Sequence, residues 1–368
     1  MRLTYVLERY PELSQTFVED ELRALPDEVT VLALQAGSTL AEAQFEAVYP
    51  PGPAARLAAL ARNPRLVRLT RNWPSDGRRL RGAARIAPWL ARTGDHVHAH
   101  FATEAADIAE LLARATGRTH SFTGHSTDLF ADPEALRRRL DAAAFAVVVC
   151  EYDRREVERL TGRPVEVIPL GVDLDRLTRS TPYNPDGPIV AVARLVEHKG
   201  LADLVAAAGT LGREVVIAGD GPLRDSLRGA ADMRGALSPR DARALIESAS
   251  LLVAPSIIAS DGSRDGIPMV IKEALALEVP VVASDAVGQP EVVEPAWGAL
   301  YQAGDRSKLA AAIAAMLDRP DREAMGRAGR VFAERNCDVR RQTAKLRELF
   351  AASGTPDGGS NVRSTLSG

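Results

Sequence analysis

The feature that most constrains the fold of this chain is a regular alternation of short apolar segments with longer helical segments. Six segments rich in β-branched residues are predicted strands in the first half of the sequence: 3–7, 29–34, 96–101, 119–123, 145–150 and 165–170. Stretches with helical periodicity, such as EAADIAELLARATG, lie between several of them. This rhythm is typical of an α/β protein with a parallel, doubly wound sheet.

The rhythm stops once and then begins again. Residues 175–187 are rich in Pro, Asn, Asp and Gly and have no periodicity, which predicts a linker. Four further strands are predicted after it: 188–194, 214–219, 251–256 and 280–284. Because 368 residues exceed what one core usually holds, we expect two Rossmann-like domains. Such pairs bind ligands in the central cleft that the two domains face, at the carboxyl ends of the strands.

The predicted domain boundaries follow from these segments. The first Rossmann-like domain is expected to span 1–174, the linker 175–187 and the second Rossmann-like domain 188–335. A terminal helix at 336–352 is predicted to pack back toward the first domain. The tail 353–368 is rich in Gly, Ser and Pro and is predicted to be disordered.

Composition excludes several classes of protein. The net charge of −3 argues against a nucleic-acid-binding protein, which would be basic. No apolar run reaches the roughly 18 residues of a membrane span, and the N-terminal segment turns polar after one strand, so we expect no signal peptide. Cys150 and Cys337 lie far apart without metal-type spacing, which indicates a reducing compartment. We therefore expect a cytoplasmic protein.

The segment ARLVEHKG places two cations, Arg194 and Lys199, between a predicted strand and the next helix. A helix N-terminus already favours negative charge, so two cations beside it are typical of a diphosphate site. Lysine is scarce in this chain, with four among 46 basic residues, which makes Lys199 informative. The alternative is that both are solvated loop cations.

A second loop, Gly219-Asp220-Gly221-Pro222, follows a predicted strand directly and is expected to open a helix. Gly219 and Gly221 permit positive φ angles and close approach of a bound ligand to the backbone. Pro222 suits the first position of a helix. Taken alone, this pattern also fits a simple turn.

A third segment, DGIPMVIKE, carries two carboxylates eight positions apart, Asp265 and Glu273. Gly266 and Pro268 predict that a helix begins between them. At helical rise the two acids are at most roughly 12 Å apart, which matches a nucleotide sugar from ribose to hexose. Carboxylates accept hydrogen bonds from vicinal hydroxyls. The alternative is one acid that the helix dipole favours and one surface glutamate.

Histidines form the next candidates. His125 follows a predicted strand of the first domain and is expected to face the cleft, where it could bond a sugar or transfer a proton. His96, His98 and His100 alternate along one strand and share one face. Three imidazoles on one face raise the possibility of zinc, but we favour cleft-lining or structural histidines and expect no metal.

Two further segments lie in the first domain. The basic stretch Arg62–Arg92 includes Trp73 and Trp89; it either meets anionic lipid headgroups or a lipid-diphosphate acceptor, or consists of solvated helix faces, which we favour. After the first strand, Thr16 and Glu19 have the spacing of a capping box, which predicts a helix N-terminus facing the cleft.

The ordered set of motifs resembles glycosyltransferase family 4, a family of retaining enzymes with the two-domain GT-B fold. The second domain carries the resemblance in VARLVEHKG, IAGDGPLRDSL, LLVAPS and DGIPMVIKEALALEVPVVAS. The first domain is similar to the branch found in colanic-acid and other exopolysaccharide biosynthesis, on VLERYPELSQTFVEDELRAL, VHAHFA and SFTGHSTDLF. The resemblance covers nearly the whole chain apart from 41–92 and the tail.

The resemblance implies roles for the motif residues. Arg194 and Lys199 match the pair that holds the donor diphosphate, and Glu273 matches the acid that binds the ribose. Asp265 occupies the position of the acid that contacts the transferred sugar, and His125 matches a histidine that faces this sugar. The loop whose backbone touches sugar and phosphate is matched by Gly266, Ile267 and Pro268.

One residue departs from the family pattern. The family usually has glutamate where this chain has Asp265, and the shorter side chain reaches about one methylene less far. Asp261 lies in the same loop and could take over part of the role. Base recognition is expected from backbone groups near Arg234–Leu237.

These observations predict a retaining glycosyltransferase that moves a sugar from a nucleoside-diphosphate sugar to a hydroxyl of a glycan, a lipid-linked or a small-molecule acceptor. Positive side chains are expected to stabilise the leaving diphosphate, so neither a metal nor a cofactor is expected. Two alternatives remain: a sugar-nucleotide epimerase of the same fold, and a non-catalytic nucleotide-sugar-binding partner subunit in which Asp265 marks lost activity.

Overall fold

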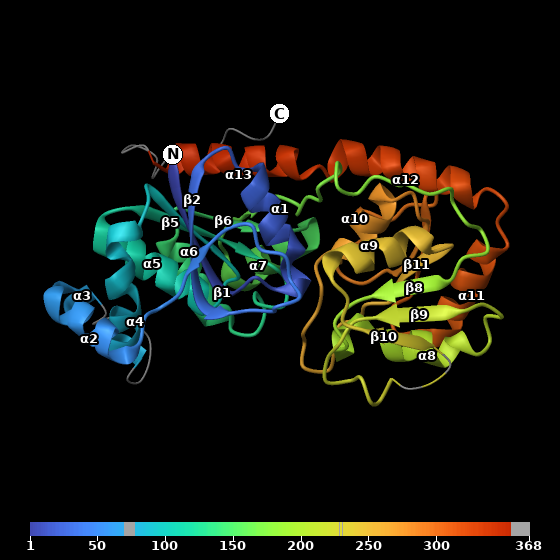
Figure 1. Ribbon diagram of the computed structural model, residues 1–368, viewed down its shortest axis with the longest axis horizontal. Coiled ribbons are helices and arrows are strands. Elements are labelled where there is room, and N and C mark those ends of the chain that lie inside the picture. The colour runs from blue at the N-terminus through green and yellow to red at the C-terminus, as the bar shows by residue number, and fades with distance from the viewer. Residues whose placement is uncertain (70–77, 228, 230, 355–368) are drawn as a thin grey trace.

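The chain forms two α/β lobes that lie side by side, each built around a parallel sheet (Figure 1). The computed structural model describes residues 1–69, 78–227, 229 and 231–354. The predicted architecture of two Rossmann-like sheets is confirmed. The predicted tail 353–368 lies outside the described residues from 355 onward.

The first sheet has seven strands in the order β3-β2-β1-β4-β5-β6-β7, and every pairing is parallel. The strands are β1 (Arg2–Tyr10), β2 (Glu28–Ala36), β3 (Ala47–Val48), β4 (His96–His100), β5 (Thr119–Gly124), β6 (Phe145–Val148) and β7 (Glu166–Val167). In the central pair, Tyr5 lies opposite His98 and Val6 opposite Ala99. Since the order reverses between β1 and β4, the sheet has the strand order of a dinucleotide-binding fold.

Helices cover both faces of this sheet. They are η1 (Leu13–Gln15), α1 (Thr16–Ala24), α2 (Pro53–Arg62), α3 (Arg65–Leu69), α4 (Arg78–Ile86), η3 (Ala87–Arg92), α5 (Glu104–Thr116), α6 (Pro133–Ala142) and α7 (Glu151–Thr161). Side chains alternate along β1, so Val6 enters a core with α5 while Tyr5 enters the core below α1. Two cores on one sheet explain why its strands read as continuous apolar runs.

The second sheet has six parallel strands in the order β10-β9-β8-β11-β12-β13. They are β8 (Ile189–Val192), β9 (Val215–Ala218), β10 (Asp232–Gly235), β11 (Leu251–Ala254), β12 (Val281–Ser284) and β13 (Gly298–Tyr301). The surrounding helices are η4 (Glu197–Lys199), α8 (Leu201–Ala208), α9 (Pro239–Ser248), α10 (Met269–Ala276), η5 (Gln289–Glu291), α11 (Arg306–Leu317) and α12 (Arg322–Asn336). One core lies below α10 and the other below α8 and α11.

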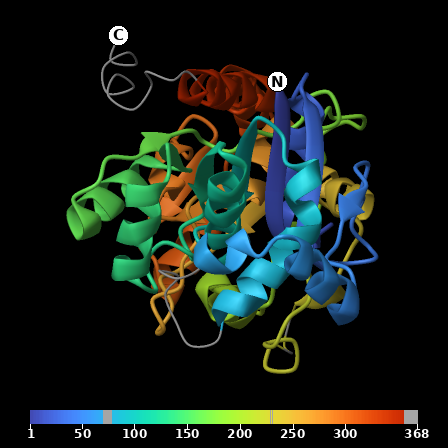
Figure 2. The ribbon, with the colours of Figure 1, turned by 90° about the vertical axis from the view of Figure 1, so that its left-hand side faces the viewer.

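A last helix, α13 (Val339–Ser353), returns the chain to the first sheet. Figure 1 shows α12 over the second lobe and α13 over the first, and Figure 2 shows α13 beside the N-terminal strand. Phe350 is fully buried there, and its ring lies 5.0 Å from that of His96. The terminal helix therefore completes the core of the first lobe.

The segment predicted as a linker, 175–187, has no regular secondary structure and is held to the second lobe. The Glu247 carboxylate accepts hydrogen bonds from the backbone and hydroxyl groups of Ser180 and Thr181. The Arg179 guanidinium donates to the carbonyls of Glu247 and Leu277. Residues 179–181 of this segment are thus fixed against α9 and the end of α10.

The basic stretch Arg62–Arg92 lies mostly on helices at the far end of the first lobe. Arg62, Arg65 and Arg68 are exposed, whereas Trp89 is 1% exposed and belongs to the core. Trp73 falls outside the described residues. Among the helices of the described chain, none is both long and apolar enough to cross a bilayer.

Candidate active site

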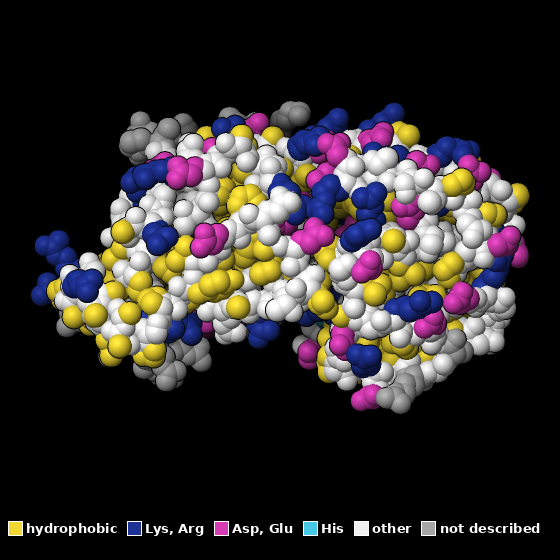
Figure 3. All heavy atoms as spheres, in the orientation of Figure 1, with side chains coloured by type: hydrophobic (Ala, Val, Ile, Leu, Met, Phe, Trp, Pro, Cys, Tyr) yellow, Lys and Arg dark blue, Asp and Glu magenta, His cyan; other side chains and the backbone are white. Residues whose placement is uncertain are grey.

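A large cleft of about 1190 Å³ separates the two lobes, and residues of both line it. Figure 3 shows charged side chains of both signs gathered where the lobes meet. The second lobe contributes the loops that follow β8, β9 and β11, because the carboxyl ends of parallel strands lie at one edge. All residues predicted to bind or act on a donor line this cleft except Gly221: His125, Arg194, Lys199, Gly219, Asp265, Gly266, Ile267, Pro268 and Glu273.

Arg194 and Lys199 occupy opposite ends of the turn between β8 and α8. Arg194 is exposed in the cleft, and no carboxylate of the described residues forms an ion pair with it. Lys199 ends the short helix η4, and its side chain is only 15% exposed. The next residue, Gly200, has a φ of +63°, and a Cβ there would lie 1.8 Å from the Pro255 carbonyl oxygen. Only glycine fits this turn, which directs Lys199 toward the loop after β11.

The glycines after β9 hold two loops against each other. A Cβ on Gly219 would lie 1.8 Å from the Ala193 carbonyl oxygen, and one on Gly221 would lie 2.6 Å from that of Leu195. The Leu195 amide donates to the Asp220 carbonyl at 2.9 Å. The close approach that requires glycine here is therefore made by the Arg194 loop, whereas we expected it from a ligand.

The predicted helix after Gly221 is wrong. Residues 221–227 form turns, in which the Arg224 amide donates to the Gly221 carbonyl and the Leu227 amide to that of Leu223. The chain next becomes regular at β10, an edge strand that bonds the Gly219 amide through Gly235. Ala236 and Leu237 follow β10 and line the cleft, where backbone recognition of a base was expected.

Asp265 is bound to Lys199. The Lys199 Nζ donates to Asp265 Oδ2 at 2.6 Å, and the Ser256 hydroxyl donates to the same oxygen at 3.0 Å. Burial favours the neutral acid, but the charges of Lys199 and His198 and the hydrogen bonds from Lys199 and Ser256 together hold the pKa of Asp265 below its usual range. The residue predicted at the sugar thus supports the residue predicted at the diphosphate. Asp261 is exposed and accepts from the Ser263 amide at 2.8 Å, away from the residues that line the cleft.

His198 belongs to the same cluster, and sequence reasoning missed it. Its Nδ1 lies 3.3 Å from the Ser263 hydroxyl and its Nε2 lies 3.7 Å from Asp265 Oδ1. This Nε2 is buried without a hydrogen-bond partner among the described residues. Burial lowers the pKa of His198, and Asp265 only partly opposes this. In the sequence, the one indication that His198 belongs to the site is its position directly before Lys199.

Glu273 lies on α10, which begins directly after Pro268 as predicted. Burial and, to a smaller extent, the charge of Asp20 raise the pKa of Glu273 to about 7, while the Thr16 hydroxyl opposes the shift. Thr16 and Asp20 belong to α1, so this carboxylate faces the first lobe. The predicted capping box is wrong: Gln15 is the N-cap of α1, without a side-chain bond, and Glu19 bonds the Tyr10 hydroxyl.

The loop before α10 contacts the first lobe directly. A Cβ on Gly266 would lie 2.6 Å from the Ser126 hydroxyl and 2.8 Å from Val149 Cγ2. Ile267 is 7% exposed and belongs to the core of the second lobe. Gly266 therefore occupies a position where the two lobes are in close contact, in addition to any contact with a ligand.

His125 reaches the cleft from the first lobe, after β5. Its ring packs against Phe101 and Phe17, with centroids 4.4 and 4.8 Å away. The His125 amide donates to Asp128 at 2.7 Å, which fixes the loop. Burial, with a smaller contribution from His100, holds the pKa of His125 well below its usual range. The ring is therefore neutral near pH 7.

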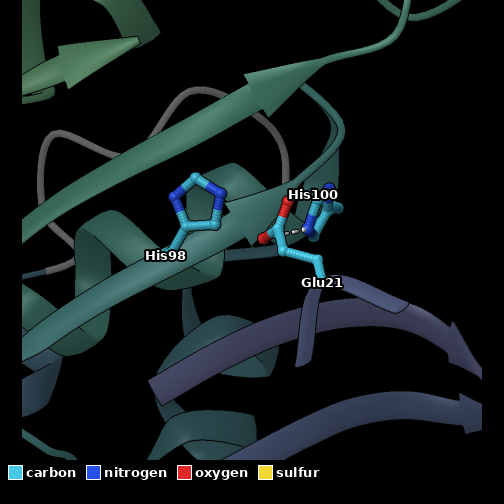
Figure 4. Close-up of side chains that lie close together, drawn as sticks. All are labelled: Glu21, His98 and His100. Atoms are coloured by element: carbon cyan, nitrogen blue, oxygen red, sulfur yellow. Dashed lines mark hydrogen bonds and ion pairs between the residues drawn. The ribbon is translucent and has the colours of Figure 1, made fainter. Parts of the chain in front are cut away.

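The three histidines of β4 are fully buried. Among the described residues, one group of possible metal ligands has its atoms within 4.8 Å, namely Glu21, His98 and His100 (Figure 4). Hydroxyl groups of Ser121 and Thr123 lie within hydrogen-bond distance of both ring nitrogens of His98. The two ring nitrogens of His100 lie within hydrogen-bond distance of His125 and Glu21. Each ring nitrogen of His98 and His100 therefore has a hydrogen-bond partner among the described residues.

Comparison with known proteins identifies this arrangement. Residues 18–176 match the family model described as Glycosyltransferase Family 4, and residues 187–319 match the model described as Glycosyl transferases group 1. This chain belongs to glycosyltransferase family 4. The two matches divide the chain between the two sheets, so each lobe corresponds to one part of this glycosyltransferase.

The similar curated proteins are bacterial glycosyltransferases. WcaL of Salmonella typhimurium, named for colanic acid biosynthesis, is 27% identical over 378 aligned residues, which cover 85% of this chain and 90% of WcaL. A GDP-mannose-dependent phosphatidylinositol monomannoside mannosyltransferase of Corynebacterium glutamicum is 31% identical over 229 residues, which cover 55% of this chain and 60% of that protein.

Solved structures share the fold. Anabaena HepE, in complex with UDP and glucose, has a TM-score of 0.74 at 18% identity, over 95% of this glycosyltransferase and 99% of HepE. A sucrose-phosphate synthase of Thermosynechococcus elongatus has a TM-score of 0.72 at 18% identity, over 96% of this chain and 100% of the synthase. Both likenesses establish the GT-B architecture.

Proposed function

We propose that this protein transfers a sugar from a nucleoside-diphosphate sugar to a hydroxyl acceptor, with retention of anomeric configuration and without a metal. One observation carries the proposal: Arg194, Lys199 and Glu273 line one cleft at the carboxyl ends of parallel strands. The comparisons add support, since one relative is named as GDP-mannose-dependent and HepE was solved with UDP and glucose.

The second lobe would bind the donor. Arg194 and Lys199 would hold the diphosphate, whose charge grows as the sugar leaves. Lys199 has three donors and gives one to Asp265, so two remain for phosphate oxygens. Glu273 would accept hydrogen bonds from ribose hydroxyls, and backbone groups of Gly219 and of Gly266–Pro268 would contact phosphate and sugar. Ala236 and Leu237 would contact the base.

The transfer would occur on one face of the sugar. The bond from the anomeric carbon to the phosphate oxygen breaks, and a bond to the acceptor oxygen forms on the same face. The acceptor's proton passes to the departing phosphate oxygen, so no protein carboxylate forms a covalent intermediate. His125 would lie against the sugar, and closure of the lobes would bring it there.

The first lobe would hold the acceptor, because it supplies the wall that faces the donor loops. On this basis we propose that the segment 175–187 separates an acceptor-binding lobe from a donor-binding lobe. We also propose that transfer takes place at the cytoplasmic side of the membrane. The exposed Arg62, Arg65 and Arg68 would allow peripheral contact with an anionic lipid surface. A glycan, a lipid-linked sugar or a small molecule would each present the required hydroxyl.

The proposal is tested by incubating the protein with UDP- and GDP-sugars, with and without candidate acceptors, in the presence of a chelator. Formation of nucleoside diphosphate that depends on the acceptor supports transfer, and the linkage in the product reports retention. An epimerase would instead change the donor sugar without acceptor.

A non-catalytic binding subunit is the second candidate, because Asp265 is the family's shortened acid and is engaged by Lys199. Such a subunit would gain thermal stability from UDP or GDP and yet never turn over. In that case Asp265→Glu should restore transfer, whereas an active wild-type protein removes this candidate.

A further inference from the structure

A chain of hydrogen bonds runs from the cleft into the first lobe. His125 Nε2 lies 3.0 Å from His100 Nδ1, and His100 Nε2 lies 3.3 Å from Glu21 Oε1. The Tyr5 hydroxyl donates to the same carboxylate oxygen at 2.7 Å. The four residues come from the loop after β5 and from β4, α1 and β1, so only the folded lobe brings them together.

This polar chain is placed where an apolar core would be expected. His100 is 0% exposed, and its ring lies 5.7 Å from Tyr5 and 5.8 Å from Phe17. Buried polar groups cost stability unless they are hydrogen-bonded, and apolar side chains would fill this space more simply. A role at the cleft explains why the polar chain ends at His125.

The bonds differ from those of a metal site. Figure 4 shows that a carboxylate oxygen of Glu21 is directed at the ring of His100, the contact drawn as a dashed line. His98 is bonded to two hydroxyls at 2.8 and 3.1 Å and makes no bond to either neighbour in Figure 4. A metal ion would compete with these hydrogen bonds for the ring nitrogens, whereas a hydrogen-bond relay through His100 and Glu21 uses the contacts as they are.

The direction of the relay follows from the groups that can only accept. A carboxylate has no proton to donate, so His100 must donate from Nε2 to Glu21. When His100 carries only this one proton, its Nδ1 is bare and accepts from the Nε2–H of His125 at 3.0 Å. His125 is left with a bare Nδ1, and this atom makes no hydrogen bond to the described residues. The ring lines the cleft, where a ligand hydroxyl could donate to it.

We propose that Glu21 and His100 are positioning residues that hold His125 as the tautomer with a bare Nδ1 facing the cleft. This assignment rests on the proposed function, since it makes His125 an acceptor for a hydroxyl of the donor sugar or of the acceptor. It also makes His125 select for ligands that donate a hydrogen bond at this point. A ligand group that can only accept would face the Nδ1 lone pair and be repelled.

The direct test uses protein labelled with ¹⁵N-histidine. The NMR signals of His125 are assigned by their loss in His125→Asn, and they report which ring nitrogen carries the proton. We expect a protonated Nε2 and a bare Nδ1 in the wild type. A proton on Nδ1 would overturn the proposal, whether or not the protein proves to be a transferase.

Matched variants connect the tautomer to catalysis. Glu21→Leu removes the acceptor and should mix the tautomers of His125, lowering kcat by about 10- to 100-fold with a smaller change in the donor KM. Glu21→Gln keeps an acceptor oxygen, so it should retain the tautomer and lose less activity. The control is His98→Asn, on the same strand with the same burial, which should leave the His125 signals unchanged.

A second pair covers a failure of Glu21→Leu to fold. His100→Asn keeps an acceptor near the Nδ1 position, whereas His100→Gln keeps a donor for Glu21 and loses the bond to His125. The relay is supported if His125 keeps its tautomer in His100→Asn and loses it in His100→Gln. Wild-type kcat in a folded Glu21→Leu, or equal effects of the two His100 variants, would contradict it. A protein with the expected tautomer and no turnover would refute only the proposed function.

Discussion

Replacing Glu273 with glutamine should change the pH dependence of stability. Burial raises the pKa of Glu273 to about 7 from an ordinary 4.5, so the folded protein keeps this proton at pH values where the unfolded chain has lost it. The folded state is therefore progressively disfavoured as pH rises from 4.5 to 7. The shift corresponds to about 3 kcal/mol of stability, which is present below about pH 4.5 and is lost as the pH rises to about 7.

Glutamine carries no charge at any pH, so Glu273→Gln removes this penalty. We expect the variant to be more stable than the wild type by about 2 kcal/mol or more at about pH 8 and nearly equal to it at about pH 5. The gain is shared with Asp20, because burial raises the pKa of Asp20 to about 6 and its charge acts on Glu273. Part of the relief will therefore appear as a lower pKa of Asp20.

Urea unfolding at both pH values, followed by fluorescence and by circular dichroism, measures the difference. The matched control is Glu348→Gln, a change at an exposed glutamate of α13, which should shift stability equally at both pH values. If Glu273→Gln parallels the wild type across this range, then Glu273 is solvated and does not face α1. The same variant should bind UDP or GDP more weakly, because the neutral amide accepts ribose hydroxyls less well.

The remaining predictions concern the loops of the second lobe. Lys199→Ala should lower kcat/KM by about 100-fold or more without lowering the melting temperature substantially, whereas Lys308→Ala, on the exposed face of α11, should keep wild-type kinetics. Gly219→Ala should destabilise the protein by about 1–3 kcal/mol in urea unfolding, because its Cβ meets a carbonyl oxygen, while Gly82→Ala in α4 should be neutral or stabilising. Asp265→Ala should lower the melting temperature, and UDP or GDP should then restore more stability than they add to the wild type, since phosphate replaces the lost counter-charge of Lys199. Equal ligand-induced shifts in the two proteins would contradict the ion pair.

The sequence was sufficient to predict the strands inside each sheet and insufficient for three of the four edge strands. Strands such as β8 and β11 read as apolar β-branched runs because both of their faces are covered. Two edge strands lacked that signal: β3 has only two residues, and β10 has the polar sequence DMRG. A third edge strand, β13, also went unpredicted, as GALY is short and follows a turn, whereas the fourth edge strand, β7, falls within the predicted strand 165–170.

The sequence predicted which residues line the cleft, but it did not predict which of these residues contact one another. The motifs marked Lys199 and Asp265, yet their ion pair joins residues 66 positions apart and depends on how the two loops pack. Glu21 had no signal of its own, because a glutamate in VEDE reads as the solvated face of a helix. Its importance follows only from α1 lying over β4, which brings its carboxylate to His100.

One loop combines the contacts between the lobes with the donor site. The Arg264 carbonyl accepts from the Thr127 hydroxyl at 2.6 Å, and the Arg264 guanidinium lies 4.6 Å from the Phe130 ring. Gly266, two residues later, packs against Ser126 of the same first-lobe loop. Asp265 lies between these contacts and bonds Lys199, so the first lobe contacts the loop that positions the cation proposed to bind phosphate. Any movement that separates the lobes must therefore break the contacts that Arg264 and Gly266 make with this first-lobe loop, on either side of Asp265.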